Sequence, residues 1–158
     1  MAEVFSICIQ KEESLDEPPY HYNRMPVGRV NLREGHGIDG DLKAGHHPKR
    51  QLNIMSQEML NVLSDEGFRT NPGEMGEQLI IKGLDVDNLD EGTQLRIGAE
   101  AIVTVHKQRE PCEWLAKIQG KSLKLAEGRV GVMASVTASG KVRVGDRVAV
   151  VKAVQAAN

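Results

Sequence analysis

Short runs rich in β-branched and aliphatic residues recur along the chain, and turns that contain glycine separate them. Runs of this length between turn residues are typical of β-strands. The runs do not alternate with helices as βαβ units would, so we predict a mainly β barrel or sandwich with two or more short helices. The expected strands cover residues 3–10, 27–32, 51–55, 78–81, 94–97, 101–108, 131–138 and 142–151.

Two segments carry the signals of short helices. Ser56 can cap a helix that continues to Gly67, a residue suited to a left-handed stop. Pro111 at a first helical position predicts a second helix that ends near Gln119. Residues 12–26 are polar, contain two adjacent prolines and lack a helical period, so we expect an exposed, flexible loop there.

The length of 158 residues suits one domain over residues 1–158, with a short tail at 152–158. Lys plus Arg number 20 and Asp plus Glu number 22, so no overall positive field favours nucleic acid or an anionic membrane. Two Phe, two Tyr and one Trp leave little material for stacking nucleic-acid bases. No apolar stretch approaches the roughly 20 residues of a membrane span. We therefore expect a cytoplasmic protein with no membrane and no nucleic-acid partner.

Three motifs for cofactors or metals fail on their context. Residues 35–40 match the glycine pattern of dinucleotide sites, but no amphipathic helix follows them. Residues 85–92 are rich in aspartate, but their spacing does not fit a calcium loop. Possible zinc ligands are His36, Asp39, Asp41, His46 and His47, and Cys112 could complete a site. Their spacing is not that of known zinc sites, so we interpret the histidines as surface side chains.

Of the two cysteines, Cys112 is the candidate for chemistry. It falls at the start of the second predicted helix, after a strand that carries Lys107 and Arg109, and both features favour the thiolate form. Two neighbouring glutamates oppose this effect, and a small buried side chain remains an equally weighted alternative. Cys8 lies in an apolar strand with no nearby cation, so we expect it to fill the core.

Several cations lie near glycine-rich turns. Lys43, Lys49 and Arg50 surround the first turn, and Arg129 lies just before the strand that begins near residue 131. Each one alone is more simply a solvated surface charge. If the fold brings them beside Cys112, they would form an anion pocket that suits a cofactor with a phosphate group.

An ordered set of short segments resembles the MOSC domain, which is named after the C-terminal part of molybdenum cofactor sulfurase. The resemblance extends from about Val4 to Val150 and is closest to the short, stand-alone members. In chain order the segments are Arg24-Met25-Pro26-Val27, residues 37–45, Arg50-Gln51, residues 72–78, Gly83-Leu84, residues 95–98, Pro111-Cys112, residues 128–131 and Val144-Gly145-Asp146.

The resemblance implies a barrel-like β fold, binding of the molybdenum cofactor, and one cysteine that carries sulfur as a persulfide or ligates molybdenum. Cys112 matches that cysteine. The chain departs from the family pattern at Leu42-Lys43, where an arginine or alanine and then a histidine are common, and at Gln78, where asparagine is usual. With Lys43 and Arg109 added as further cations, the residues expected at the cofactor are Asp41, Lys43, Arg50, Glu77, Arg109 and Arg129.

Three functions remain open at this point. The first is a cofactor-binding or sulfur-carrier domain supplied by a sulfur-donor protein such as a cysteine desulfurase. The second is a molybdenum-dependent reductase of N-hydroxylated compounds, which needs an electron-donor protein because two cysteines cannot hold the usual iron–sulfur clusters. The third is a non-catalytic interaction barrel in which Cys112 has no chemical role. No separate domain that would hold pyridoxal phosphate is visible.

Overall fold

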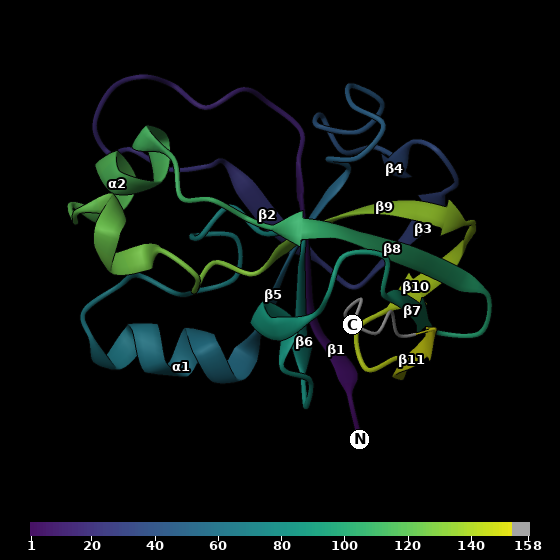
Figure 1. Cartoon of the computed structure of the whole chain (residues 1–158). Helices are drawn as coiled ribbons and strands as arrows, with labels where there is room; N and C mark the ends of the chain where they lie inside the picture. The colour runs from purple at the N-terminus through teal and green to yellow at the C-terminus, as the bar shows by residue number, and fades with distance from the viewer. Residues whose placement is uncertain (153–158) are drawn as a thin grey trace.

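The larger of two β-sheets forms the body of the molecule, and helices lie at one end of it (Figure 1). The structure, a computed structural model, describes residues 1–152. In spatial order the larger sheet contains β11 (Val148–Lys152), β7 (Gln94–Ile97), β8 (Ala101–Gln108), β9 (Val132–Ala138), β5 (Leu52–Ser56), β6 (Leu79–Lys82), β1 (Glu3–Gln10) and β2 (Arg24–Val27). The smaller sheet contains β10 (Gly140–Arg143), β3 (Arg29–Arg33) and β4 (Gly37–Ile38).

The mainly β fold is confirmed, but the described strands do not close into a barrel. Strands β11 and β2 occupy the two ends of the larger sheet. The strand β1 approaches the β11 end only through an isolated bridge between Glu3 and Arg147, without a continuous ladder. The helical segments are α1 (Gln57–Asp65), α2 (Glu113–Gln119) and two 3₁₀ turns, η1 (Val86–Asn88) and η2 (Leu123–Ala126).

Several expected boundaries need correction. The run 27–32 is two strands in different sheets, separated at Gly28, and the run 142–151 is likewise divided between β10 and β11. The expected loop ends before Arg24, because β2 pairs with β1 there. Strand β4 has only two residues and so leaves no periodic signal in the sequence. Residues 153–158 of the expected tail lie outside the described residues.

One βαβ unit is present although the sequence pattern indicated none. Strands β5 and β6 are parallel neighbours, and α1 lies in the connection between them. The helix begins as predicted, because the Ser56 hydroxyl accepts a hydrogen bond of 3.0 Å from the backbone N–H of Met59. The long segment between α1 and β6 has no periodic pattern, so the sequence gives no sign that β5 and β6 are parallel neighbours.

The start of α2 also differs from the expectation. The first helical residue is Glu113, and Cys112 is the N-cap with an extended backbone conformation. Pro111 therefore precedes the helix and does not occupy its first turn. The helix stops as expected at Gly120, which adopts the left-handed conformation with φ of 64°.

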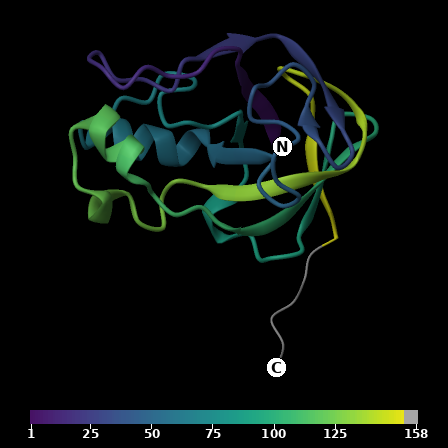
Figure 2. The same cartoon turned by 90° about the horizontal axis from the view of Figure 1, so that it is seen from above.

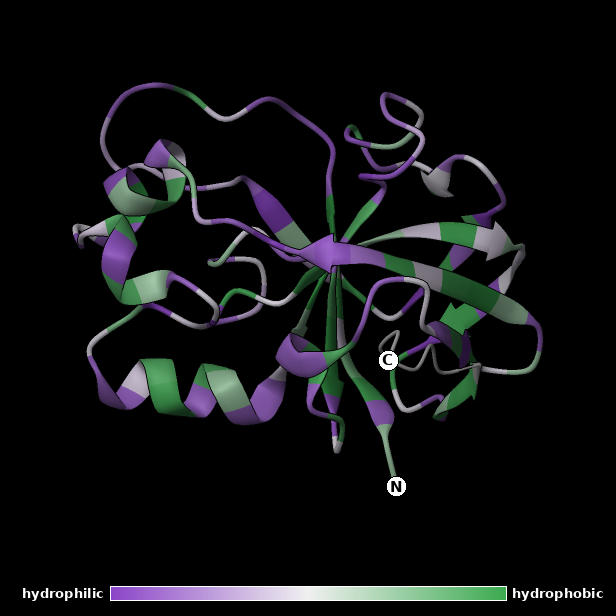
Figure 3. Cartoon of the chain, viewed as in Figure 1, coloured by the Kyte–Doolittle hydropathy of each residue, from purple (hydrophilic) through white to green (hydrophobic). Residues whose placement is uncertain are grey.

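Two apolar cores support this arrangement. The main core lies among the strands of both sheets, where hydrophobic residues cluster along the strand interiors (Figure 3). A second core packs α1 and α2 against side chains of β5 and β6, and it includes Leu63, Met75 and Leu115. Both helices lie at the end of the molecule away from β10 and β11 (Figures 1 and 2). No helix within residues 1–152 is long and apolar enough to span a membrane.

Candidate functional site

Cys112 presents an exposed thiol at the start of α2. Its Sγ lies 3.8 Å from the hydroxyl oxygen of Tyr22. That oxygen also accepts a hydrogen bond of 3.3 Å from Nη2 of Arg109. Because the Arg109 guanidinium donates to the Tyr22 oxygen, the hydroxyl proton of Tyr22 is free to point toward the sulfur. The three side chains therefore form a relay that ends at Cys112.

The relay is held in place from the protein interior. Arg109 is buried, and its Nη1 donates a hydrogen bond of 2.7 Å to the backbone carbonyl of Met75. Gly76 makes room for the relay: a Cβ at this position would lie 2.6 Å from Cζ of Tyr22 and 2.9 Å from Nη2 of Arg109. Burial raises the pKa of Tyr22, so the phenol stays protonated at neutral pH. It can therefore donate to a thiolate.

A hollow of about 380 Å³ lies beside this relay. Tyr22 connects the two, because it lines the hollow and contacts Cys112. Three cations and two acids are among the residues that line it, which are Gln10, Glu13, Ser14, Asp16, Tyr22, Arg24, Lys43, Trp114 and Lys117. The volume falls within the range of small-molecule sites.

Arg24 is the most unusual residue of the hollow. Its side chain is only 4% exposed, yet Nε and Nη1 have no hydrogen-bond partner. The nearest carboxylate contact is 3.7 Å, between Nη1 and Oδ1 of Asp41, beyond hydrogen-bond distance. Burial lowers the pKa of Arg24, while the charges of Asp41 and Glu77 oppose that shift. A buried guanidinium with unused donors is costly unless a ligand supplies acceptors.

Two buried acids near Arg24, Asp41 and Glu77, accept hydrogen bonds from other groups of the protein. Asp41 accepts hydrogen bonds from the backbone N–H of Gln10 at 2.9 Å and from Nε2 of Gln78 at 3.3 Å. Glu77 accepts from the backbone N–H of Gly73 at 2.6 Å and of Met75 at 3.1 Å. Burial raises the pKa of Glu77, although these donors and Arg109 oppose the shift. Both acids thus shape the walls around Arg24 and Arg109.

The segment between β1 and β2 closes one side of the hollow. Asp16 forms an ion pair of 2.7 Å with Lys117 of α2, and Glu13 lies 3.7 Å from Lys43. The ring of Tyr20 packs edge-on against Trp114, with centroids 5.7 Å apart. Figure 1 shows this segment crossing to the α2 end of the molecule.

The structure brings together some, but not all, of the residues expected at the cofactor. Lys43 lines the hollow, and Arg109, Asp41 and Glu77 lie behind it. Arg129 instead forms an ion pair with Glu66, and its Nη1 donates to the carbonyl of Leu125. Arg50 is exposed and does not line the hollow. The cofactor role of Arg50 and Arg129 stays a prediction.

Sequence reasoning missed the roles of Arg24, Tyr22, Trp114 and Lys117. Arg24 belongs to one of the segments that carry the family resemblance, so a signal for it was present. Cys8 is buried as expected, and burial raises the pKa of its thiol to about 11. Within residues 1–152, no three His, Cys, Asp or Glu side chains are grouped as metal ligands would be.

Comparison with known proteins identifies a family and a fold. The sequence model of the MOSC domain matches residues 40–149. The crystal structure of the YuaD protein from Bacillus subtilis superposes with a TM-score of 0.76 at 22% identity, covering 94% of each chain. YiiM from Escherichia coli gives a TM-score of 0.72 at 24% identity, covering 98% of this chain and 72% of YiiM. YiiM from Geobacillus stearothermophilus gives a TM-score of 0.73 at 19% identity, covering 96% of this chain and 76% of YiiM. No curated protein matches the sequence.

Proposed function

The chain belongs to the MOSC domain family, which is associated with the molybdenum cofactor, and we propose that it binds this cofactor in the hollow beside Cys112. We further propose that Cys112 carries a transferable sulfur atom as a persulfide. The sulfur would come from a sulfur-donor protein such as a cysteine desulfurase. The protein is then a cofactor-binding sulfur carrier.

The observation that carries the proposal is the pairing of a reactive group with an anion-binding group. Cys112 offers an exposed sulfur, and Arg24 offers buried donors that have no hydrogen-bond partner in the protein. Tyr22 lies between them, because it lines the hollow with Arg24 and contacts Cys112. A phosphate-bearing pterin fits this set: its phosphate would accept from Arg24, and a soft sulfur atom suits molybdenum.

Each cation of the hollow has a role toward the anionic end of the cofactor. Arg24 would supply the desolvated, charge-assisted hydrogen bonds, which are about twice as strong as neutral ones. Lys43 and Lys117 are about half exposed and would add charge at the entrance. When bound, the cofactor supplies a thiophilic metal near Cys112.

The loading of sulfur onto Cys112 is an exchange at a persulfide. The Cys112 thiolate attacks the outer sulfur of the donor's persulfide, a new S–S bond forms, and the donor cysteine leaves as a thiolate that takes up a proton. The exchange needs no external oxidant or reductant. The Tyr22 hydroxyl lies 3.8 Å from the sulfur and can donate to it, which would stabilise both the attacking thiolate and the bound persulfide.

The test uses protein purified from cells with ample molybdenum. Bound pterin is measured by fluorescence after oxidation, molybdenum by elemental analysis, and persulfide by release of sulfane sulfur after incubation with a cysteine desulfurase and cysteine. Arg24→Met should lose at least tenfold in bound pterin. Cys112→Ser should keep pterin and lose persulfide.

Two control variants separate these effects from general damage. Arg96→Met removes an exposed arginine of β7 that lies outside the hollow, and Cys8→Ser changes the buried thiol. Both should retain pterin and persulfide. If Arg24→Met and Arg96→Met bind pterin equally well, cofactor binding at this hollow is wrong. If Cys112→Ser loses molybdenum but the wild type never carries persulfide, Cys112 is a metal ligand and the carrier role is wrong.

A further inference from the structure

A second, separate feature is a strip of positive side chains on the smaller sheet. Arg29 and Arg33 of β3 are exposed, and so are Lys141 and Arg143 of β10. Alternation along the strands directs the intervening Leu32 and Val142 into the core. We call these four side chains the cationic strip. It lies at the end of the molecule opposite α2 (Figure 1).

The cationic strip is poorly neutralised by the protein itself. The β3–β10 register places Arg143 directly opposite Arg29, and like charges in that position destabilise a sheet. Within the described part of the chain, Arg33 forms an ion pair with Asp39 at 3.0 Å, whereas Arg29, Lys141 and Arg143 form none. The whole chain has a net charge of −2, so the strip is a local reversal of sign.

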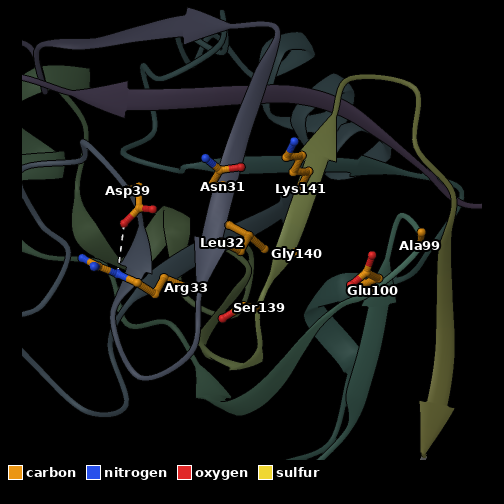
Figure 4. A pocket seen from close by; sticks show the side chains of 9 residues that line it. All are labelled: Asn31, Leu32, Arg33, Asp39, Ala99, Glu100, Ser139, Gly140 and Lys141. Atoms are coloured by element: carbon orange, nitrogen blue, oxygen red, sulfur yellow. Dashed lines mark ion pairs between the residues drawn. The ribbon is translucent and has the colours of Figure 1, made fainter.

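The surface is also hollowed along the strip. One depression of about 560 Å³ lies over β3, β10 and the turn before β8, and its lining residues appear in Figure 4. A second depression of about 420 Å³ lies between Arg29, Lys141 and Arg143. The two depressions adjoin along the strand direction, because Asn31 and Lys141 line both of them, and together we call them the groove.

We propose that this groove binds an extended acidic segment of a partner protein. Lys141 and Arg143 are two residues apart on β10, a distance of about 7 Å, and carboxylates at alternate positions of an extended peptide have the same repeat. Arg29 and Arg33 would face the same segment from β3 over about 13 Å. The open amide of Asn31 can bind the peptide backbone between them.

The composition of the groove favours a protein partner over a nucleic acid. No aromatic side chain lines either depression, so bases would find no stacking surface. Asp39 and Glu100 lie at the edge of the larger depression and would repel a continuous phosphate backbone. They would also oppose carboxylates, but a peptide with alternating charge can place its neutral residues at these points.

Fluorescence anisotropy with a labelled Glu-Ser-Glu-Ser-Glu-Ser-Glu peptide tests the proposal. We expect saturable binding that falls at least tenfold in the double variant Lys141→Gln/Arg143→Gln. The control double variant Arg96→Gln/Lys107→Gln removes two exposed strand cations outside the groove and should bind as the wild type does. A peptide with Gln at each Glu position should not bind.

Three results would overturn the proposal. The first is no binding of the acidic peptide at millimolar concentration. The second is an equal loss in the control variant, which would indicate general charge attraction. The third is tighter binding of a labelled twelve-nucleotide single strand with the same dependence on Lys141 and Arg143, which would make the groove a nucleic-acid surface. None of these measurements depends on Cys112 or on bound cofactor.

Discussion

Replacement of Gly131 by alanine should be among the most damaging small changes in the chain. Gly131 has φ of +79°, in the left-handed region. A Cβ there would overlap the carbonyl oxygen of Ile54 and lie 2.8 Å from its carbonyl carbon. Ile54 belongs to β5, which is held between β6 and β9, so its backbone has little freedom to move.

The cost can be built up from three contributions. An alanine in the left-handed region costs about 1–2 kcal/mol. Forcing β5 away adds about 1–3 kcal/mol, as overpacking usually does. Movement of residue 131 also weakens the 2.7 Å hydrogen bond from its N–H to Oδ1 of the buried Asp87. These contributions are not additive, and we expect a total loss of about 4 kcal/mol in the free energy of unfolding.

Urea unfolding, followed by circular dichroism, measures this loss. With a slope of about 2 kcal/mol per molar, the midpoint should fall by about 2 M. Gly35→Ala is the matched control, because Gly35 has φ of +72° and nothing within 4 Å of an added Cβ. Its midpoint should fall by only about 0.5–1 M, the cost of backbone strain alone. Equal midpoints for the two variants would show that β5 yields easily and that the overlap argument is wrong.

Two further predictions concern the cysteines and the buried Glu77. At pH 8, iodoacetamide should label Cys112 and leave Cys8 unlabelled, since Cys8 is buried with a raised pKa; mass spectrometry would contradict this by finding Cys8 modified in folded protein. Burial raises the pKa of Glu77 above the unfolded value of about 4.3, so the folded state retains a proton to higher pH. The free energy of unfolding should therefore fall as pH rises above about 4, and Glu77→Gln should flatten that slope in urea titrations; an unchanged slope would contradict it.

The parts of the fold that the sequence predicts are those with local signals. The start of α1 depends on Ser56 and the amide three residues later, and the end of α2 depends on Gly120. The assignment of strands to sheets has no such signal. A single turn after Arg143 moves the chain from one sheet to the other, and only the pairing of distant strands determines this.

The same distinction applies to the site. The neighbours of Cys112 in the chain make it a candidate, and the structure places its thiol exposed at the N-cap of α2, while its chemical role stays a prediction. The unusual state of Arg24 depends on Gln10 opposite it in β1 and on Asp41 from a later loop. Burial without hydrogen bonds is a property of the folded chain, so residue type and spacing could not reveal it.

The ion pairs across the hollow have a consequence for the choice of ligand. Glu13 and Asp16, with side chains 75% and 78% exposed, already neutralise Lys43 and Lys117 in the free protein. An entering anion must therefore displace two internal counterions, and exposed pairs of this kind are worth only about 0–1 kcal/mol each. A dianion that also reaches Arg24 recovers this cost, whereas a monoanion such as chloride or acetate cannot engage all three cations at once. We therefore expect the segment between β1 and β2 to compete with entering anions and to favour dianions over monoanions.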